Sequence, residues 1–543
     1  MAERPTYRLP RSVVPRRYEL TFTPDLPGKA FSGTELVTCD VVEGTHEFVL
    51  NAAALTVVEA ELLGQDGVAL SGAVSYRPEE EQVVLTWPQT VEPGSWTLRT
   101  RFSGVLGEDL RGFYRTTVKG PQGQTVVIAS TQCESTDARR VFPCWDEPDF
   151  KAVFAVTLLI EPELMALSNG PEIENVLEDS GKRRVTFAET MPMSTYLVAL
   201  VVGPLVLTEP VMMGRIPVRI AARPELSHLT DVAQEAAVST LKFFQEYFGI
   251  PSPADKMDHV AIPEFAAGAM ENLGCVTYRE EALLIDRERS SPVEQMRVVT
   301  TIAHETAHMW FGDLVTMRWW NGLWLNEAFA TFMEQLATDA LHPEWDVWTA
   351  FGPGRAYALR VDGLASTRPV EFPVGPPSEA QAMFDVLTYE KGGAVLRAME
   401  QYLEPEVFRR GIQRYLTRHQ YGNTETSDLW NALEEESGQP VRAVMDSWVT
   451  QGGYPLVRAT WDQKSQMLRL HQEPFRYLGQ GVGRWQIPIV LGIARSNGSR
   501  DTVRVLLKGE SVDVPIPYDM PQALWRFYNW PTNCPDNRVA SAR

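Results

Sequence analysis

The stretch His304-Glu305-Thr306-Ala307-His308 places two histidines four positions apart. Residues at this spacing lie on one face of a helix, one turn above each other. Neutral imidazoles so placed can both bind one zinc ion, and the glutamate between them can act as general base on a water held by the zinc. The alternative is a helix whose histidines are ordinary core or surface residues.

A catalytic zinc site needs a third protein ligand, because such sites usually take three and leave one position open. Glu327 provides a candidate in the run Trp324-Leu325-Asn326-Glu327-Ala328-Phe329-Ala330. The intervening chain is long enough to end one helix, turn at Gly312-Asp313 and begin a second helix that carries the carboxylate inward. The sequence therefore predicts a zinc hydrolase with one zinc ion.

Length, composition and charge narrow the class of protein. At 543 residues the chain is too long for one hydrophobic core, so about two to four domains are expected. The net charge of −20 argues against nucleic acid as a partner, since binding it needs clustered lysine and arginine. Because no apolar run approaches the ~18 residues of a membrane span, we expect no membrane partner either. We expect a monomer.

The cysteines indicate a reducing compartment. They are odd in number, scattered and without a Cys-x-x-Cys pair, which suits free thiols better than a disulfide framework. The N-terminus shows no apolar region of a secretory signal. We therefore predict a cytoplasmic location, although a chain whose leader had been removed would show the same pattern. The cysteines are Cys39, Cys133, Cys144, Cys275 and Cys534.

Hydrophobic patterning divides the chain into three parts, and we expect an α+β multidomain protein. From residue 7 to 207, alternating or wholly apolar runs such as 18–23 and 153–160 predict strands. We assign 1–208 to an N-terminal β-rich domain.

The rest of the chain is expected to form a mainly helical domain, 209–452, and a small β-sandwich, 453–543. Alternation returns after Gly452-Gly453-Tyr454-Pro455, as in 467–471 and 502–507. The expected helical stretches are 231–248, 292–311, 325–341, 391–403 and 405–418.

Three further segments carry candidate substrate contacts. Gly268-Ala269-Met270-Glu271-Asn272 can form an edge strand against which a peptide backbone pairs, with Glu271 directed into the cleft. Its alternative is a solvated turn. Tyr389 precedes the pair Gly392-Gly393 at an expected helix start, from which its hydroxyl can reach an oxyanion. Alone, Tyr389 is more often a core aromatic, and Glu134 in Thr131-Gln132-Cys133-Glu134 more often a surface carboxylate.

Together these segments resemble, in matching order, the aminopeptidase N family of zinc metallopeptidases, gluzincins that include leukotriene hydrolase. The similarity extends from Pro15-Arg-Arg-Tyr18 to Trp448-Val-Thr-Gln-Gly-Gly-Tyr-Pro455. It implies an N-terminal β-sandwich saddle, a thermolysin-like and mainly helical catalytic domain, and a small C-terminal β-sandwich. Relatives usually continue into a large helical domain that roofs the cleft, and we expect this chain to lack it.

The resemblance also implies roles by position. Glu305 matches the general base and Tyr389 the oxyanion donor. Glu271 and Glu134 match the positions that bind the free α-amine; some members, leukotriene hydrolase among them, have glutamine in place of Glu134. The implied zinc ligands are His304, His308 and Glu327. The implied exopeptidase motif is Gly268, Ala269, Met270, Glu271 and Asn272.

The function that follows is a zinc-dependent aminopeptidase, which hydrolyses the N-terminal residue from peptides with a free N-terminus. Three alternatives stay open: an epoxide hydrolase of the leukotriene type, a zinc endopeptidase, and a catalytically silent scaffold if the helical domain is required. Glu134 argues against the first and the amine-binding pair against the second. The intact metal motif argues against the third.

Overall fold

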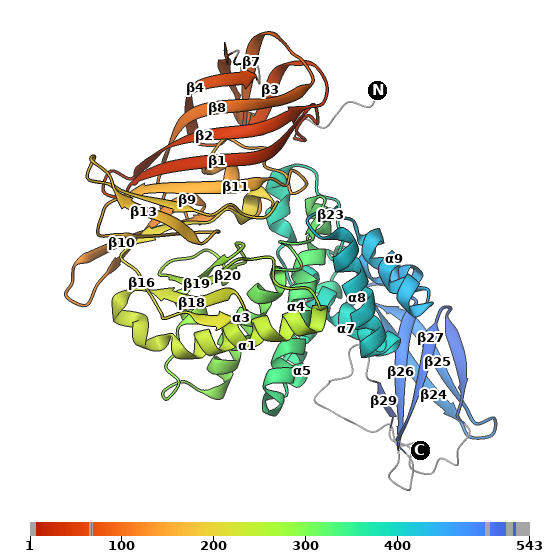
Figure 1. Ribbon diagram of the computed structural model, residues 1–543. Helices are drawn as coiled ribbons and strands as arrows, with labels where there is room; N and C mark the ends of the chain where they lie inside the picture. Colours follow the sequence, from red (N-terminus) through yellow and green to blue (C-terminus); the bar gives the residue numbers. More distant parts are fainter. Residues whose placement is uncertain (1–6, 65–66, 68, 495–499, 517–524, 528–543) are drawn as a thin grey trace.

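The computed structural model describes residues 7–64, 67, 69–494, 500–516 and 525–527. A β-rich N-terminal part is followed by a helical part and then by C-terminal strands (Figure 1). This order confirms the predicted succession of a β-rich part, a mainly helical catalytic part and closing strands. Among the described residues, no helix is both long enough and apolar enough to span a membrane.

The N-terminal part is built on a long sheet whose central strand, β1, alternates between buried and more exposed positions. β1 pairs antiparallel with β2 and parallel with β11, and the Tyr18 ring of β1 stacks on Phe154 of β11 at 4.9 Å between ring centroids. In sheet order the strands are β13 (Glu172–Leu177), β14 (Arg183–Phe187), β11 (Val153–Ile160), β1 (Val13–Asp25), β2 (Ala30–Val41), β8 (Gly94–Val105), β4 (Leu55–Gly64) and β5 (Ala69–Ser71).

Two smaller sheets complete this part. The first consists of β12 (Met165–Ser168), β15 (Leu200–Gly203), β10 (Thr125–Gln132) and β9 (Gly112–Lys119). The second consists of β3 (Thr45–Asn51), β7 (Gln82–Val91) and β6 (Ala73–Arg77). Strand β10 ends two residues before Glu134, so this sheet aims that carboxylate toward the helical part.

The catalytic part begins with a sheet that the mainly helical prediction for 209–452 missed. Its central strand β19 is buried at every position, so it shows no alternation that a sequence pattern could reveal. The strands are β16 (Val206–Leu207), β17 (Val211–Met213), β18 (Ile216–Ala222), β19 (Met257–Ile262), β21 (Cys275–Arg279) and, at the edge, β20 (Ala269–Met270).

Five predicted helices form within a few residues of their expected bounds. The second of them, Pro292–His308, begins where expected because Ser291 and Glu294 form a reciprocal capping box and proline occupies the first turn. Helices α3 and α4 pack against each other (Figure 1). The helices are α1 (Asp231–Phe248), α2 (Glu280–Leu283), α3 (Pro292–His308), α4 (Trp324–Leu341), α5 (Val347–Ala350), α6 (Gly352–Asp362), α7 (Gly392–Leu403), α8 (Pro405–His419), α9 (Thr426–Ser437) and α10 (Val441–Val449).

The remaining short strands β22 (Thr316–Met317) and β23 (Asn423–Thr424) pair with each other. The C-terminal part holds two three-stranded sheets. One contains β24 (Tyr454–Asp462), β25 (Met467–Phe475) and β28 (Ser511–Pro515). The other contains β27 (Arg500–Leu507), β26 (Ile487–Ala494) and β29 (Trp525–Phe527).

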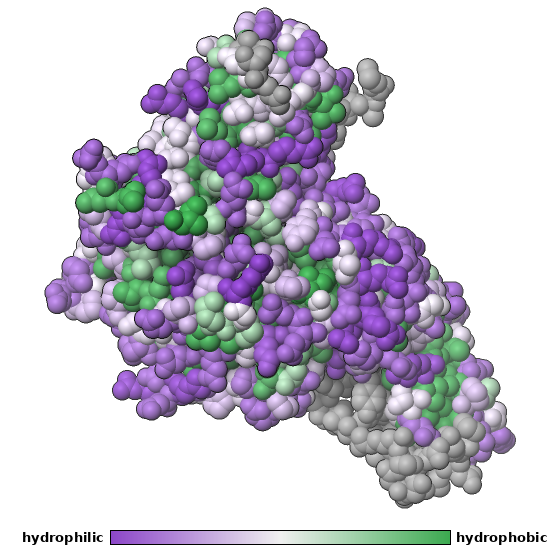
Figure 2. Space-filling view, viewed as in Figure 1, coloured by the Kyte–Doolittle hydropathy of each residue, from purple (hydrophilic) through white to green (hydrophobic). Residues whose placement is uncertain are grey.

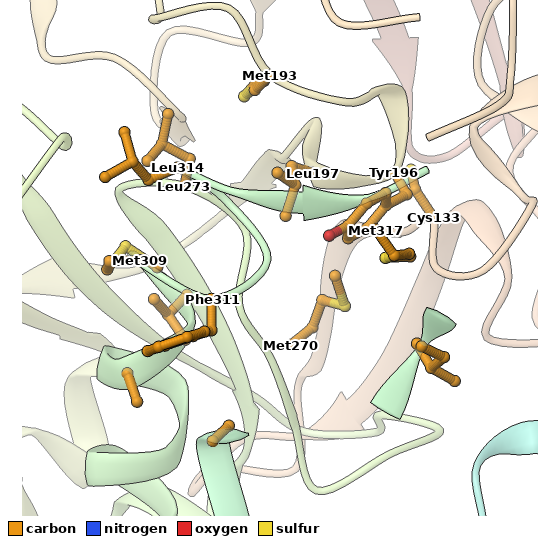
Figure 3. Packing of buried hydrophobic residues seen from close by; sticks show 14 of the residues in the cluster. Cys133, Met193, Tyr196, Leu197, Met270, Leu273, Met309, Phe311, Leu314 and Met317 are labelled. Carbon is orange, nitrogen blue, oxygen red and sulfur yellow. The ribbon is translucent and has the colours of Figure 1, made fainter. Parts of the chain in front are cut away.

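The N-terminal and catalytic parts share one hydrophobic core. Figure 3 shows Cys133, Met193 and Leu197 of the first part close to Met270 and Leu273 of the second. All five side chains are buried. This shared packing places the chain around Glu134 against the edge strand β20.

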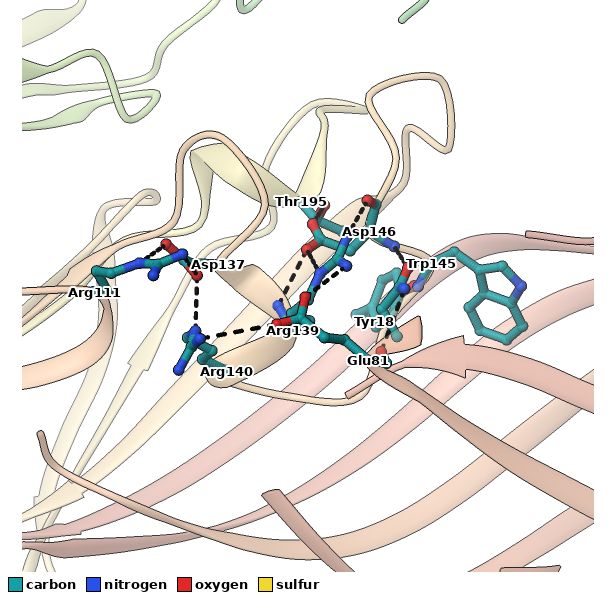
Figure 4. A network of polar contacts seen from close by, with 10 residues as sticks. Tyr18, Glu81, Arg111, Asp137, Arg139, Arg140, Trp145, Asp146 and Thr195 are labelled. Carbon is teal, nitrogen blue, oxygen red and sulfur yellow. Dashed lines mark hydrogen bonds and ion pairs between the residues drawn. The ribbon is translucent and has the colours of Figure 1, made fainter. Parts of the chain in front are cut away.

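Buried charges fix the loop that follows Glu134 (Figure 4). Arg139 donates to Asp146 at 2.8 Å, and each side chain is only 2 % exposed. Asp137 accepts from both Arg111 and Arg140 at 2.8 Å. Because breaking a buried pair costs several kcal/mol, about 3–5 in typical cases, this network holds the loop in one conformation.

The cysteine prediction holds for the residues that the structure describes. Cys39, Cys133, Cys144 and Cys275 are buried free thiols. Cys534 lies outside the described residues. The cytoplasmic location that was inferred from this pattern stays a prediction.

Glu35 of β2 should make stability depend on pH. Its side chain is buried, Thr100 donates to Oε1 at 2.8 Å, and Oε2 has no partner among the described residues. Burial raises the pKa of Glu35 from 4.5 to about 8. The folded state therefore holds this proton more tightly than the unfolded state does, and stability is lost as pH rises from 4.5 through 8.

We expect Glu35→Gln, which cannot ionise, to melt a few degrees above the wild type at pH 8.5 and to lose that advantage at pH 5. Thermal melts followed by circular dichroism at both pH values test this. Glu43→Gln, at an exposed position, is the matched control. An equal melting difference at the two pH values would contradict the assignment.

Candidate active site

A cavity of about 490 Å³ lies where the N-terminal part meets α3, α4 and the edge strand β20. Its described lining contains no lysine or arginine. Nine of the predicted site residues line it directly. They are Glu134, Gly268, Ala269, Glu271, His304, Glu305, His308, Glu327 and Tyr389.

The three predicted metal ligands converge at the floor of this cavity. His304 and His308 project from α3, and Glu327 projects from α4. The Nε2 atoms of His304 and His308 lie 3.3 and 3.5 Å from Oε2 of Glu327. Candidate ligand atoms of the three residues lie within 4.8 Å of one another. Two imidazoles and one carboxylate form a donor set that suits zinc, so the residues fit the ion.

Each histidine is oriented through its other ring nitrogen. Nδ1 of His304 lies 2.7 Å from Oε2 of Glu334, and Nδ1 of His308 lies 2.8 Å from the carbonyl oxygen of Phe311. Both acceptors favour a proton on Nδ1, which leaves Nε2 free to bind a metal. The sequence reasoning missed Glu334. The available signal was its position seven residues, or two helical turns, after Glu327 on α4.

Removing the Glu334 carboxylate should weaken zinc binding. Second partners of metal-binding histidines typically contribute about 10–100-fold in metal affinity, and we expect a loss of that size for Glu334→Ala. Zinc affinity is measured by competition with a chromophoric chelator. The control is Glu344→Ala, which removes an exposed carboxylate 3.3 Å from the surface histidine His342. An unchanged zinc affinity in Glu334→Ala would contradict this role.

Glu305 lies between the two histidines on the same helix. It is 5 % exposed, and its Oε2 has no hydrogen-bond partner among the described residues. Burial raises the pKa of Glu305 to about 8, although His304 and His308 both act to lower it. The carboxyl thus has a free oxygen at the cavity, available to a water or a substrate.

Two more carboxylates face the cavity from the other side. Oxygens of Glu134 and Glu271 lie within 4.8 Å of each other and of an oxygen of Glu327. Oε1 is buried without a partner in both Glu134 and Glu271, within the described part of the chain. Burial and, after it, repulsion from Glu271 raise the pKa of Glu134 well above its usual range. A cation bound here would offset both the burial of these carboxylates and the repulsion between them.

The predicted edge strand is confirmed, but only part of its motif faces the cavity. β20 pairs antiparallel with β21 and ends the sheet. Met270 and Asn272 are each 1 % exposed and are not among the residues that line the cavity, and the substrate contact predicted for them stays a prediction. Met270 packs against Gln132, and Asn272 donates to Thr277 at 3.2 Å. They support the strand from behind.

Tyr389 lies in a π-helical turn, Leu387–Lys391, directly before α7, where a helix start was expected. Its ring stacks on His304, with 6.0 Å between ring centroids. Burial, followed by the charge of Glu327, raises the pKa of Tyr389 well above 10. The hydroxyl therefore keeps its proton and can donate a hydrogen bond near the histidines.

Two protein-family models match the chain, one in its N-terminal part and one in its helical part. Residues 14–197 match the model of the peptidase M1 N-terminal domain, and residues 232–448 match that of the peptidase family M1 domain. Similar curated proteins include aminopeptidase M1-A of Oryza sativa subsp. japonica, 44 % identical over 89 % of this chain and 55 % of the relative.

Relatives with lower sequence identity match a similar share of this chain. Aminopeptidase 2 of Candida albicans is 38 % identical over 94 % of this chain and 55 % of its own length. Human endoplasmic reticulum aminopeptidase 1 is 35 % identical over 94 % of this chain and 57 % of its own length. The chain thus spans about half the length of the curated relatives that it matches.

Proposed function

The chain belongs to the peptidase M1 family, and on that premise we propose that it is a zinc-dependent aminopeptidase acting on peptides with a free N-terminus. The observation that carries the proposal is the pair Glu134 and Glu271, which places buried, unpartnered carboxylate oxygens beside the metal-ligand cluster. A metal site alone suits many hydrolases. A metal site with an anionic wall suits a substrate whose cation lies next to the bond that breaks.

The ion would be held by His304, His308 and Glu327. When bound, zinc supplies positive charge that polarises a carbonyl oxygen and lowers the pKa of a coordinated water to about 7. Glu305 then accepts a proton from the attacking water through its free oxygen and passes it to the leaving amine. Tyr389 donates a hydrogen bond to the oxyanion that develops on the former carbonyl.

Glu134 and Glu271 set which bond is cut. Their carboxylates bind the α-ammonium, which brings the carbonyl of the same residue to Glu305. A blocked N-terminus leaves both carboxylates buried without a partner, which costs affinity. The chemistry therefore releases only the first residue. An endopeptidase does not bind a free α-amine, so it does not need these two carboxylates. Glutamate at position 134 argues against the epoxide hydrolase.

The proposal is tested with aminoacyl-coumarin substrates and their N-acetylated forms, each with and without a zinc chelator. We expect chelator-sensitive hydrolysis of the free-amine set alone. Equal hydrolysis of the acetylated set would move the activity to an endopeptidase. No hydrolysis of either set by zinc-loaded protein would support the silent scaffold. The monomeric state and the cytoplasmic location stay predictions.

A further inference from the structure

A second cavity, of about 580 Å³, lies between the N-terminal part and the sheet of the catalytic part. It is bounded by β12, β13 and β14 on one side and by β18 and β19 on the other, at the left in Figure 1. It shares no lining residue with the candidate active site. It is therefore a separate space, and nothing in the proposed peptidase chemistry uses it.

Part of the wall of this cavity is apolar. Leu167, Val185, Phe187 and Leu205 line it and are buried, and Leu164 lines it while half-buried. Around its rim the surface is also hydrophobic. Figure 2 shows hydrophobic surface near β13, where Ile173 and Leu177 are 66 % and 69 % exposed. The apolar part of a ligand would leave water and bury its surface against these side chains, which is favourable.

At one end of the cavity, two basic side chains contact one buried carboxylate. Asp258 is fully buried and accepts from Arg219 at 2.7 and 2.9 Å through two oxygens. Lys256, 1 % exposed, lies 2.8 Å from the same carboxylate and donates to the Gly274 carbonyl oxygen at 2.6 Å. Two cations thus share one anion. All three residues line the cavity, and Arg219, with 26 % of its side chain exposed, is the most accessible of them.

A second guanidinium adds to this excess of positive charge. Arg183 lines the cavity, and within the described residues its side chain has no ion pair or hydrogen bond. The carboxylates in the lining other than Asp258 are Glu163 and Glu172. Both are exposed, so water screens their charge. The lining therefore offers Nη1 of Arg219 and the guanidinium of Arg183, which have no hydrogen-bond acceptor among the described residues, beside apolar side chains.

We propose that this interdomain cavity binds a small organic carboxylate with an apolar body, with Arg219 and Arg183 holding the carboxylate. Asp258 holds the guanidinium of Arg219 in one orientation. The guanidinium is therefore preorganised to pair with a ligand carboxylate through two parallel hydrogen bonds. The apolar walls accept the remainder of the ligand. This inference does not depend on the proposed aminopeptidase activity.

Isothermal titration of the zinc-loaded full chain with octanoate tests the site, with octylammonium as the probe of the same length and opposite charge. We expect saturable binding of octanoate that octylammonium does not displace, because an ammonium ion would bind at Glu134 and Glu271 in the candidate active site. Arg219→Gln should weaken octanoate binding at least about tenfold. Leu164→Trp, which narrows the cavity without touching the charged group, should weaken it independently.

The matched control is Arg215→Gln, which changes an arginine whose side chain is 76 % exposed and which does not line the cavity. Its octanoate affinity should equal that of the wild type. Three results would overturn the proposal. They are no saturable binding, binding that neither cavity variant changes, and binding that disappears only when zinc is removed, since the carboxylate would then be a ligand of the metal.

Discussion

Glu305→Gln is expected to lower kcat for aminoacyl substrates by about 10²–10⁴-fold, the range that a positioned general base contributes. Glutamine keeps the volume of the buried side chain, so the packing of α3 should be unchanged. It cannot accept the proton that Glu305 takes through its free oxygen. Zinc content should match that of the wild type, because the proposed ligand set of His304, His308 and Glu327 is unchanged.

Steady-state kinetics and zinc analysis of the same preparation test this expectation. Glu281→Gln makes the same chemical change at an exposed position and should leave both quantities unaltered. Activity within a few-fold of the wild type would remove Glu305 as the base. A parallel loss of zinc would show that the variant changed the metal site rather than the proton transfer.

Glu271→Gln is expected to lower kcat/KM on free-amine substrates by about 30-fold to several thousand-fold. Removing one partner of a buried charge pair costs about 2–5 kcal/mol, and each 1.4 kcal/mol is tenfold. The loss should be confined to substrates with an ammonium group, since Glu271 binds that group and takes no part in the proton transfer.

The value of kcat/KM on free-amine substrates is the decisive measurement, with zinc content determined alongside. We expect kcat/KM to fall in Glu271→Gln and to stay at the wild-type value in Glu281→Gln. An unchanged kcat/KM in Glu271→Gln would place the amine site elsewhere in the cavity.

Local pattern was sufficient for the helices and for the metal motif. Helical spacing and few breakers placed α1, α4 and α8 within about one residue of their bounds. The same periodicity put His304 and His308 on one face of α3. Strand β19 escaped the analysis because a strand buried on both faces has no period-two signal.

The sequence by itself determined that His304 and His308 share one face of a helix, because four-residue spacing on a helix is a local property of the chain. The tertiary structure decided what surrounds them. Glu134 reaches the cavity because a shared core and the buried Arg139–Asp146 pair fix its loop against the catalytic part. Glu334 orients His304 only because α4 packs on α3. Contacts between distant segments depend on side-chain packing across the interface, which no spacing along one chain encodes.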